Sequence, residues 1–239
     1  MRHNNQFWAI IPAAGVGRRM QADRPKQYLS LHNKTVIEHS LDRLLALDEV
    51  CGVVLSISDE DDYWAELDYR SPKPIHIARG GRERSDSVLN ALTLLAEKLP
   101  DHKNIWVLVH DAARPCVRIA DIKKLIDRVG PDYPGGLLAL PVRDTMKRSL
   151  DNIDSVEQTV ERKGLWHALT PQMFRLDLLI HALQQALQKN LSITDDASAM
   201  ELAGYQPQLV EAHEDNIKIT RAFDLQLAEL YLQHQAQAE

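Results

Sequence analysis

The first candidate site is a loop near the N-terminus in which glycines and basic residues are crowded together. In the stretch "IIPAAGVGRRMQADRPKQY", Gly15 and Gly17 follow an apolar run, and Arg19 and Lys26 come soon after them. Glycine lets backbone N–H groups approach an anion closely, and a guanidinium and an ammonium add positive charge. We therefore interpret this stretch as a phosphate-binding loop. A glycine-rich turn with two solvated basic side chains is the alternative.

This loop differs from two well-known phosphate-binding motifs. A dinucleotide-binding fingerprint needs a third small residue after the two glycines, but Arg18, Arg19 and Met20 stand there. A Walker loop needs Gly-Lys-Ser or Gly-Lys-Thr at its end, and the stretch has neither. In addition, no Asp or Glu obviously ends the second predicted strand before Ser58. An NAD-binding oxidoreductase is therefore disfavoured.

Two further loops place polar or charged side chains directly after predicted strands. In "HIARGGRERSDSV", Ser85 or Asp86 stands in the cap position before an amphipathic helix, whose free N–H groups could meet a base or a phosphate. In "WVLVHDAARP", a buried strand ends in Asp111, where a carboxylate could hold Mg²⁺ or a sugar hydroxyl. Each loop also has a purely structural interpretation, because these side chains could simply cap the turn or helix that follows.

The last cluster lies before the C-terminal helix, in "EDNIKITRAFDL". Lys218 and Thr220 follow the predicted strand "PQLVEA", so they too stand near a strand end. Thr220 could instead be a helix cap, and Lys218 could be an ordinary surface lysine.

These loops connect elements that alternate between strand-like and helix-like patterns. Near-continuous Val/Ile/Leu runs indicate strands buried on both faces, and helices between them indicate right-handed parallel crossovers. The sequence therefore predicts an α/β fold with a Rossmann-like, doubly wound, mostly parallel sheet. Strands are expected at 7–12, 50–58 and 135–142, and in the run that ends at Asp111. Helices are expected at 35–47, 85–99, 120–130, 175–190 and 220–235.

One segment, residues 142–165, interrupts the alternation. Two weak strand-like pieces flank the turn-rich "SLDNID", with too few apolar residues to bury a face. We expect a β-hairpin arm that protrudes from a single domain spanning 1–239. Because an isolated hairpin is marginally stable in water, we expect the arm to mediate dimerisation; a mobile surface loop is the alternative.

Composition limits the partners and the compartment. The formal net charge of −6 argues against broad binding to nucleic acid or to an anionic membrane. Cys51 and Cys116 form neither a disulfide framework nor a zinc-site spacing, and no run has the length of a membrane span. These features predict a cytoplasmic protein.

Eight motifs, read in order, resemble one enzyme family. They are "PAAGVGRRM", "PKQY", "GGRERSDSV", "VHDAARP", "PVRDTMKR", "LWHALTPQ", "ITDDASAME" and "DNIKIT". The set is similar to that of the 2-C-methyl-D-erythritol 4-phosphate cytidylyltransferases, which act in the non-mevalonate isoprenoid pathway, and it extends from about Trp8 to Leu232. The first motif alone indicates a nucleotidyltransferase, whereas the ordered set is much more specific.

The resemblance implies a reaction in which a phosphate oxygen of methylerythritol phosphate attacks the α-phosphorus of CTP and Mg²⁺-pyrophosphate leaves. It implies that Arg19, Lys26 and Lys218 are the catalytic cations at the reacting phosphates. Asp111 would also lie beside the Mg²⁺ ion or the sugar hydroxyls. The residues that the resemblance assigns to nucleotide binding are Ala13, Ala14, Gly15, Gly81, Arg84, Ser87 and Asp111.

The resemblance also gives the arm a function in a homodimer. It implies that Thr145 and Arg162 bind methylerythritol phosphate and that Arg162 reaches into the partner's site. An ordinary strand threonine and a solvated arginine are the alternatives. His167 is expected to be a buried or half-buried structural residue, and Arg82 departs from an acidic residue often found there in the family. Weaker substrate-binding assignments fall on Arg114, Thr170, Thr194 and Thr220.

Three other functions are weighed against this one. A cytidylyltransferase for another polyol phosphate, such as ribitol 5-phosphate, has similar motifs, although "RDTMKR" favours methylerythritol. A sugar-1-phosphate nucleotidyltransferase would share the first loop but would need a larger sugar pocket. A nucleotide sensor without catalytic activity is the alternative from a different class.

Overall fold

The computed structural model describes residues 5–15, 23–99, 104–129, 133–150 and 154–238. Within these residues, seven strands form one sheet in the order β11-β7-β10-β6-β1-β4-β5. β10 pairs antiparallel with both β6 and β7, while the other neighbouring pairs are parallel. The sheet is therefore mostly parallel, as the sequence predicts. Its strands are β1 (Gln6–Pro12), β4 (Val50–Ile57), β5 (Ile75–Arg79), β6 (Ile105–Val109), β7 (Gly135–Pro141), β10 (Trp166–Arg175) and β11 (Gln208–Glu211).

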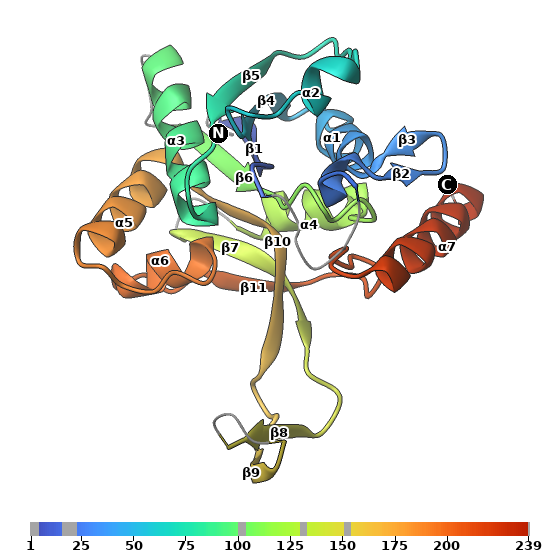
Figure 1. Ribbon diagram of the computed structural model, residues 1–239. Helices are drawn as coiled ribbons and strands as arrows, with labels where there is room; N and C mark the ends of the chain where they lie inside the picture. The colour runs from blue at the N-terminus through green and yellow to red at the C-terminus, as the bar shows by residue number, and fades with distance from the viewer. Residues whose placement is uncertain (1–4, 16–22, 100–103, 130–132, 151–153, 239) are drawn as a thin grey trace.

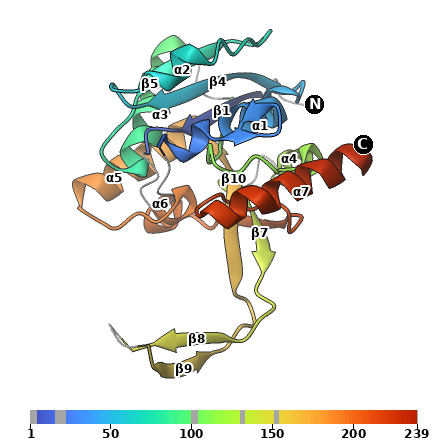
Figure 2. The same ribbon diagram turned by 45° about the vertical axis from the view of Figure 1, so that its right-hand side comes forward.

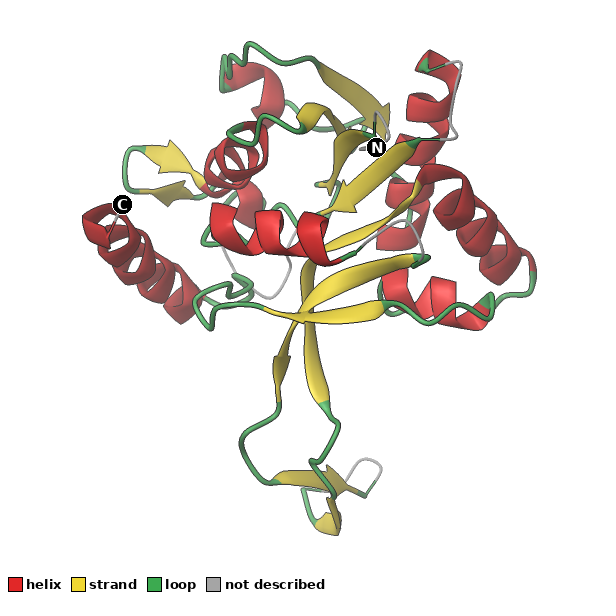
Figure 3. Ribbon diagram, turned by 180° about the vertical axis from the view of Figure 1, so that it is seen from behind, coloured by secondary structure: helices red, strands yellow, loops and turns green. Residues whose placement is uncertain are grey.

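Helices lie on both sides of this sheet, as Figure 3 shows. On one side are α1 (Val36–Leu45) and α4 (Ile119–Arg128), and on the other are α3 (Arg84–Lys98), α5 (Leu176–Gln188) and α6 (Asp196–Leu202). α7 (Ala222–Ala238) packs beside the small β2–β3 hairpin (Ser30–Leu31 and Lys34–Thr35). Two short elements, α2 (Tyr63–Glu66) and the 3₁₀ helix η2 (Lys26–Tyr28), complete the described helices.

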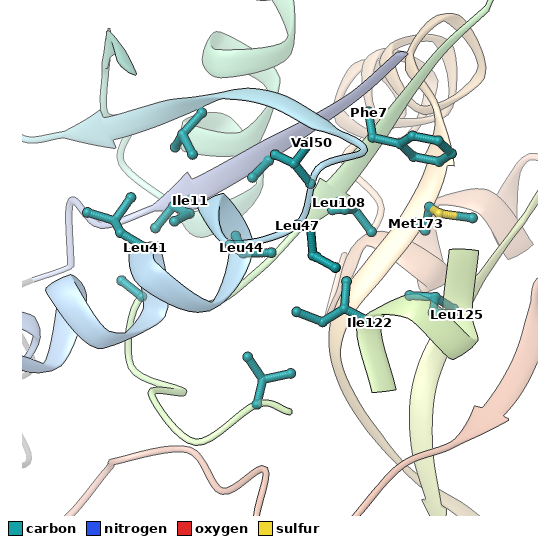
Figure 4. Packing of buried hydrophobic residues seen from close by; sticks show 14 of the residues in the cluster. Phe7, Ile11, Leu41, Leu44, Leu47, Val50, Leu108, Ile122, Leu125 and Met173 are labelled. Atoms are coloured by element: carbon teal, nitrogen blue, oxygen red, sulfur yellow. The ribbon is translucent and has the colours of Figure 1, made fainter. Parts of the chain in front are cut away.

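Alternation along β1 contributes to two hydrophobic cores. Phe7 and Ile11 of β1 face α1 and α4, whereas Trp8 and Ile10 face α3 and α5. Figure 4 shows the first core, where Leu41 and other side chains of α1 meet side chains of α4 and the sheet. A strand buried on both faces must be apolar at consecutive positions, which explains the run "FWAII".

Three predicted element boundaries shift in the structure. α3 begins at Arg84 rather than after Ser85 or Asp86, because Glu83 is its N-cap and forms a capping box with Asp86. The helix expected at 120–130 ends at Arg128 within the described residues. The helix expected at 220–235 begins at Ala222 and continues to Ala238.

The predicted arm is present as a β-hairpin. β8 (Met146–Ser149) and β9 (Val156–Val160) pair antiparallel. The chain connects β8 to the end of β7, and β9 to the start of β10. Figures 1 and 2 both show the hairpin well separated from the helices of the domain. Its side chains are largely exposed, and the apolar side chain of Val156 is 61% exposed. A hairpin with this exposure has no hydrophobic core of its own.

The described helices include none that is long and apolar enough to span a membrane.

Candidate functional site

A cleft opens at the carboxyl ends of β1, β5 and β6. From β1 the chain continues to β4, whereas from β6 it continues in the opposite direction along the sheet, to β7. Open α/β sheets bind ligands in the crevice at such a switch point. The cleft is lined by residues 12–15, Lys26, Gln27, residues 81–84, Ser87, residues 111–113 and Lys218.

The first wall of the cleft is the backbone that follows β1. The N–H of Ala13 donates to the carbonyl of Ser56 at 2.8 Å, and the buried amide of Gln27 donates to the carbonyl of Ala13 at 2.6 Å. Lys26 lies at the start of η2, and its Nζ donates to the carbonyl of Ile219 at 2.9 Å. The backbone of residues 13–15 and the ammonium of Lys26 therefore share one cleft, as predicted. Arg19 lies outside the described residues.

The second wall is the loop between β5 and α3. The hydroxyl of Ser87 accepts a hydrogen bond from the N–H of Gly81 at 2.9 Å and donates to the carbonyl of Glu83 at 3.2 Å. A Cβ at Gly81 would lie 2.1 Å from the Cβ of Asp86, so this position has no room for a side chain. Ser87 thus shapes the loop backbone at the cleft, and its predicted contact with a nucleotide stays a prediction.

Asp111 lies at the floor of the cleft among three cations. Its Oδ1 is 2.9 Å from Nε of Arg84, and its Oδ2 is 2.8 Å from Nζ of Lys218 and 3.5 Å from Nε of Arg114. Burial opposes ionisation of this carboxyl, but the charges of Arg84, Lys218 and Arg114 outweigh burial and hold its pKa well below the usual range. Asp111 is therefore an ionised anchor for the basic side chains, as well as the end of β6.

Arg84 also contacts a carboxylate for which the sequence predicts no function. Its Nη2 lies 2.9 Å from Oδ2 of Asp196, a fully buried residue in the first turn of α6. Burial opposes protonation of Arg84, but the two carboxylates outweigh burial and raise its pKa. In the sequence, Asp196 belongs to the acidic pair of the motif "ITDDASAME", which is the only local signal for it.

A buried hydrogen-bond network supports Asp111 from behind. The hydroxyl of Thr170 accepts from the N–H of Asp111 at 3.1 Å and lies 3.0 Å from Nδ1 of His110, whose Nε2 lies 3.1 Å from the carbonyl of Arg114. A carbonyl only accepts, so Nε2 carries the proton and Nδ1 accepts from the Thr170 hydroxyl. Arg114 also donates to the carbonyl of Asn216 at 2.8 Å. Arg114 and Thr170 thus hold the turn after β6, and their predicted contacts with a substrate stay predictions.

The other predicted substrate-binding residues do not line this cleft as the described residues form it. Thr194 is exposed just before α6, and the hydroxyl of Thr220 donates to Asp224 at 2.9 Å at the start of α7. The Thr220 hydroxyl is thus a donor at the helix start, whereas the helix cap of the alternative would accept from a backbone N–H. Thr145 and Arg162 are exposed at the base of the β8–β9 hairpin, where Arg162 donates to the carbonyl of Arg143.

The expectation for His167 is wrong. This residue is exposed rather than buried, because it lies in the part of β10 that extends from the domain toward the arm.

Asp111 does not fit as a direct ligand of a metal ion in this arrangement. Both of its carboxylate oxygens already face cations. Among the described residues, no group of three or more His, Cys, Asp or Glu side chains could hold a metal ion. Mg²⁺ in phosphate-transferring enzymes is commonly held by few carboxylates together with the phosphates of the substrate. A metal that entered on a triphosphate would therefore need no protein cage here.

Comparisons with known proteins agree on one family. The model of the family described as "2-C-methyl-D-erythritol 4-phosphate cytidylyltransferase" matches residues 7–234. A protein of that name from Aliivibrio fischeri (strain MJ11) is 55% identical over 225 residues, which cover 94% of this chain and 93% of the relative. The crystal structure of the Francisella tularensis protein of the same name is similar with a TM-score of 0.80 at 36% identity, covering 95% of this chain and 100% of that chain. A crystal structure of a 4-diphosphocytidyl-2C-methyl-D-erythritol synthase gives a TM-score of 0.82, also at 36% identity, covering 95% of this chain and 98% of that chain.

Proposed function

The chain belongs to the 2-C-methyl-D-erythritol 4-phosphate cytidylyltransferase family, and we infer that it transfers the CMP moiety of CTP to 2-C-methyl-D-erythritol 4-phosphate. The products are CDP-methylerythritol and pyrophosphate, a step of isoprenoid biosynthesis. The enzyme is a nucleotidyltransferase. The observation that supports this reaction best is the cleft in which Lys26 and Lys218 face the glycine-containing backbone after β1.

The chemistry needs positioned positive charge more than it needs a base. The phosphate of methylerythritol phosphate is already anionic at neutral pH, so it attacks the α-phosphorus of CTP without first losing a proton to the protein. Negative charge then builds up on the phosphate oxygens in the transition state, and fixed cations stabilise it. Lys26 and Lys218 supply such charge from the lining of the cleft, and Arg19 is the third cation of the proposed set.

The nucleotide is held by main-chain groups in this proposal. The backbone of Ala13, Ala14 and Gly15 binds the triphosphate, and the backbone around Gly81 reads the edge of the base. Ser87 supports the second of these contacts, because its hydroxyl already holds the N–H of Gly81. Asp111 lines the same cleft beside Lys218, and it accepts a sugar hydroxyl there in this proposal.

The acceptor substrate is bound by residues of two subunits in this proposal. Thr145 and Arg162 lie on an arm that has no hydrophobic core of its own, and a second copy of the chain would cover its exposed apolar side chains. In such a homodimer, Arg162 would reach the phosphate of methylerythritol phosphate in the partner's cleft. Arg114, Thr170, Thr194 and Thr220 complete the proposed acceptor site.

Two further properties are part of the proposal. Mg²⁺ bound to CTP would be held mainly by the triphosphate oxygens, and it would neutralise charge on the leaving pyrophosphate. The enzyme works in the cytoplasm, a location that agrees with the free thiols of Cys51 and Cys116.

A direct assay tests the reaction. The protein is incubated with CTP, Mg²⁺ and methylerythritol phosphate, pyrophosphate release is measured, and the nucleotide product is identified by mass. Ribitol 5-phosphate replaces the acceptor in one control, and ATP, GTP and UTP replace CTP in others. Pyrophosphate with ribitol 5-phosphate and not with methylerythritol phosphate would contradict the proposed acceptor, and binding of CTP without turnover would indicate a nucleotide sensor.

A further inference from the structure

Four charged side chains form a line of alternating sign that ends in the cleft. Asp196 contacts Arg84 through Oδ2 and Nη2 at 2.9 Å, and Arg84 contacts Asp111 through Nε and Oδ1 at 2.9 Å. The other oxygen of Asp111, Oδ2, lies 2.8 Å from Nζ of Lys218. We call these four residues the charge line. It connects the first turn of α6 to a lysine that faces the reacting phosphates in the proposed function.

The buried end of the charge line is fixed by the domain core. Asp196 is completely buried, and the N–H of the next residue, Ala197, donates to the side chain of Gln172 on β10 at 2.7 Å. The side chain of Gln172 is itself buried and also donates to Asp195 at 2.8 Å. The position of the Asp196 carboxylate is therefore set by the sheet, and not by solvent or by a ligand.

Arg84 can transmit this fixed position because its guanidinium is a rigid plane. When Asp196 holds Nη2, the direction in which Nε points is also fixed. Nε then holds Oδ1 of Asp111, which leaves Oδ2 toward Lys218. A lysine in that place would give the same charge but would not fix the orientation of two carboxylates.

We propose that Asp196 is a positioning residue for the transfer reaction: it orients Arg84, Arg84 orients Asp111, and Asp111 places the ammonium of Lys218. Asp196 itself touches no substrate, because it is fully buried beneath Arg84. The inference rests on the proposed function, since the placement of Lys218 matters for turnover only if phosphates react beside it.

The first test is Asp196→Asn, which keeps the size of the side chain and removes its charge. We expect kcat to fall by about tenfold to a hundredfold, because a small misplacement of a catalytic group has effects of this size. The KM for CTP should change little, since main-chain groups bind the nucleotide. The matched control is Glu201→Gln on the same helix, where an exposed carboxylate is removed and kcat should equal that of the wild type.

The second test changes Arg84, the residue of the charge line between the two carboxylates. Arg84→Lys keeps a positive charge but lacks the rigid plane of donors that orients both carboxylates, so kcat should fall as in Asp196→Asn even if the latter variant folds poorly. In the Arg84→Lys background, Asp196→Asn should lower kcat little further, because both changes break the same connection. Thermal unfolding and the folded fraction are measured for every variant.

The outcomes separate the inference from the proposed function. If the variants lower the Tm while kcat per folded enzyme stays at the wild-type value, Asp196 has a purely structural role and the inference is wrong. The inference would also be wrong if the losses in kcat of the two single variants added fully in the double variant. Absence of turnover in the wild-type protein would overturn the proposed reaction and the inference together.

Discussion

At the scale of single residues, the two lysines of the cleft are held by acceptors. Lys26 donates to the carbonyl of Ile219, and Lys218 pairs with Asp111. Because these two acceptors lie on the segments after β6 and β11, both ammonium groups are already near the places where phosphate charge would develop. Such preorganised charge lowers a barrier without the cost of moving dipoles during the reaction.

The first prediction concerns Lys26. Lys26→Ala should lower kcat by about two to three orders of magnitude, as expected for loss of a group that stabilises charge in the transition state. Arg19→Ala should behave similarly. The fold should persist in both, as checked by circular dichroism and the Tm, and Lys123→Ala on the exposed side of α4 is the control that should keep full activity. Near-normal rates in Lys26→Ala would contradict the catalytic assignment.

Residue types in the loops predicted the lining of the cleft but not the pairs within it. The glycine and lysine pattern after β1 and the carboxylate at the end of β6 placed Lys26 and Asp111 at one sheet edge, and the structure confirms that placement. The pairing of Arg84 with Asp196 could not be predicted, because the two residues are 112 positions apart and their helices meet only in the folded domain.

At the scale of elements, apolar runs predicted the strands that are buried on both faces. They did not predict β10, because "WHALTPQMFR" mixes polar and apolar residues and includes a proline. Its first part leads to the arm and is partly exposed, while its second part is buried between β6 and β7. The spacing of apolar residues along β10 mixes these two environments. A strand that extends beyond the sheet is therefore hard to predict from that spacing.

The C-terminal helix α7 gives a prediction about stability. The amide of Gln235 donates to Asp215 at 2.8 Å and to the carbonyl of Cys116 at 2.9 Å, and its oxygen accepts from Arg43 at 2.7 Å. Gln235→Ala would leave buried polar groups with fewer partners, so the free energy of unfolding in urea should fall by about 1–3 kcal/mol. Gln233→Ala, at an exposed position of the same helix, should change it little. Equal losses in the free energy of unfolding for Gln235→Ala and Gln233→Ala would show that these contacts do not hold α7.

The arm gives a prediction about cooperation between subunits. Arg162→Ala should raise the KM for methylerythritol phosphate by about tenfold or more, because a hydrogen bond to a charged group contributes roughly 1.5–3 kcal/mol. The KM for CTP should stay near the wild-type value.

Mixing the arm variant with a cleft variant tests whether the arm acts across subunits. A mixed dimer of Arg162→Ala and Lys26→Ala has one site with an intact lysine and an intact arm. At low acceptor concentration, an equal mixture should recover about a quarter of the wild-type rate, since half of the dimers are mixed and each has one intact site. No recovery after subunit exchange would indicate a site built within one chain.

At the scale of the whole molecule, the sheet brings together loops that are distant in sequence, and a buried histidine supports their junction. His110 is completely buried between the end of β6 and Thr170 of β10. Burial lowers its pKa from 6.5 to about 4, against the weaker opposing effects of its hydrogen bonds and of Asp111. The neutral imidazole is therefore part of the native structure at neutral pH, and the stability of the domain should depend on it.

The last prediction follows from the sign of this shift. Between the unfolded pKa of 6.5 and the native pKa of about 4, the unfolded chain binds a proton that native His110 does not bind, so falling pH favours unfolding. The wild type should lose about 3 kcal/mol of stability to this group across that interval, from the size of the shift.

The control is His110→Gln, which keeps a donor and an acceptor but does not titrate. The free energy of unfolding of this variant should lack the loss at low pH, even if its stability at neutral pH is lower. Urea unfolding of both proteins between about pH 4 and pH 7 measures the difference, and other groups that titrate there contribute to both curves. Parallel curves would mean that His110 binds its proton equally in the native and unfolded states, and the support it gives to Asp111 would then not depend on a neutral ring.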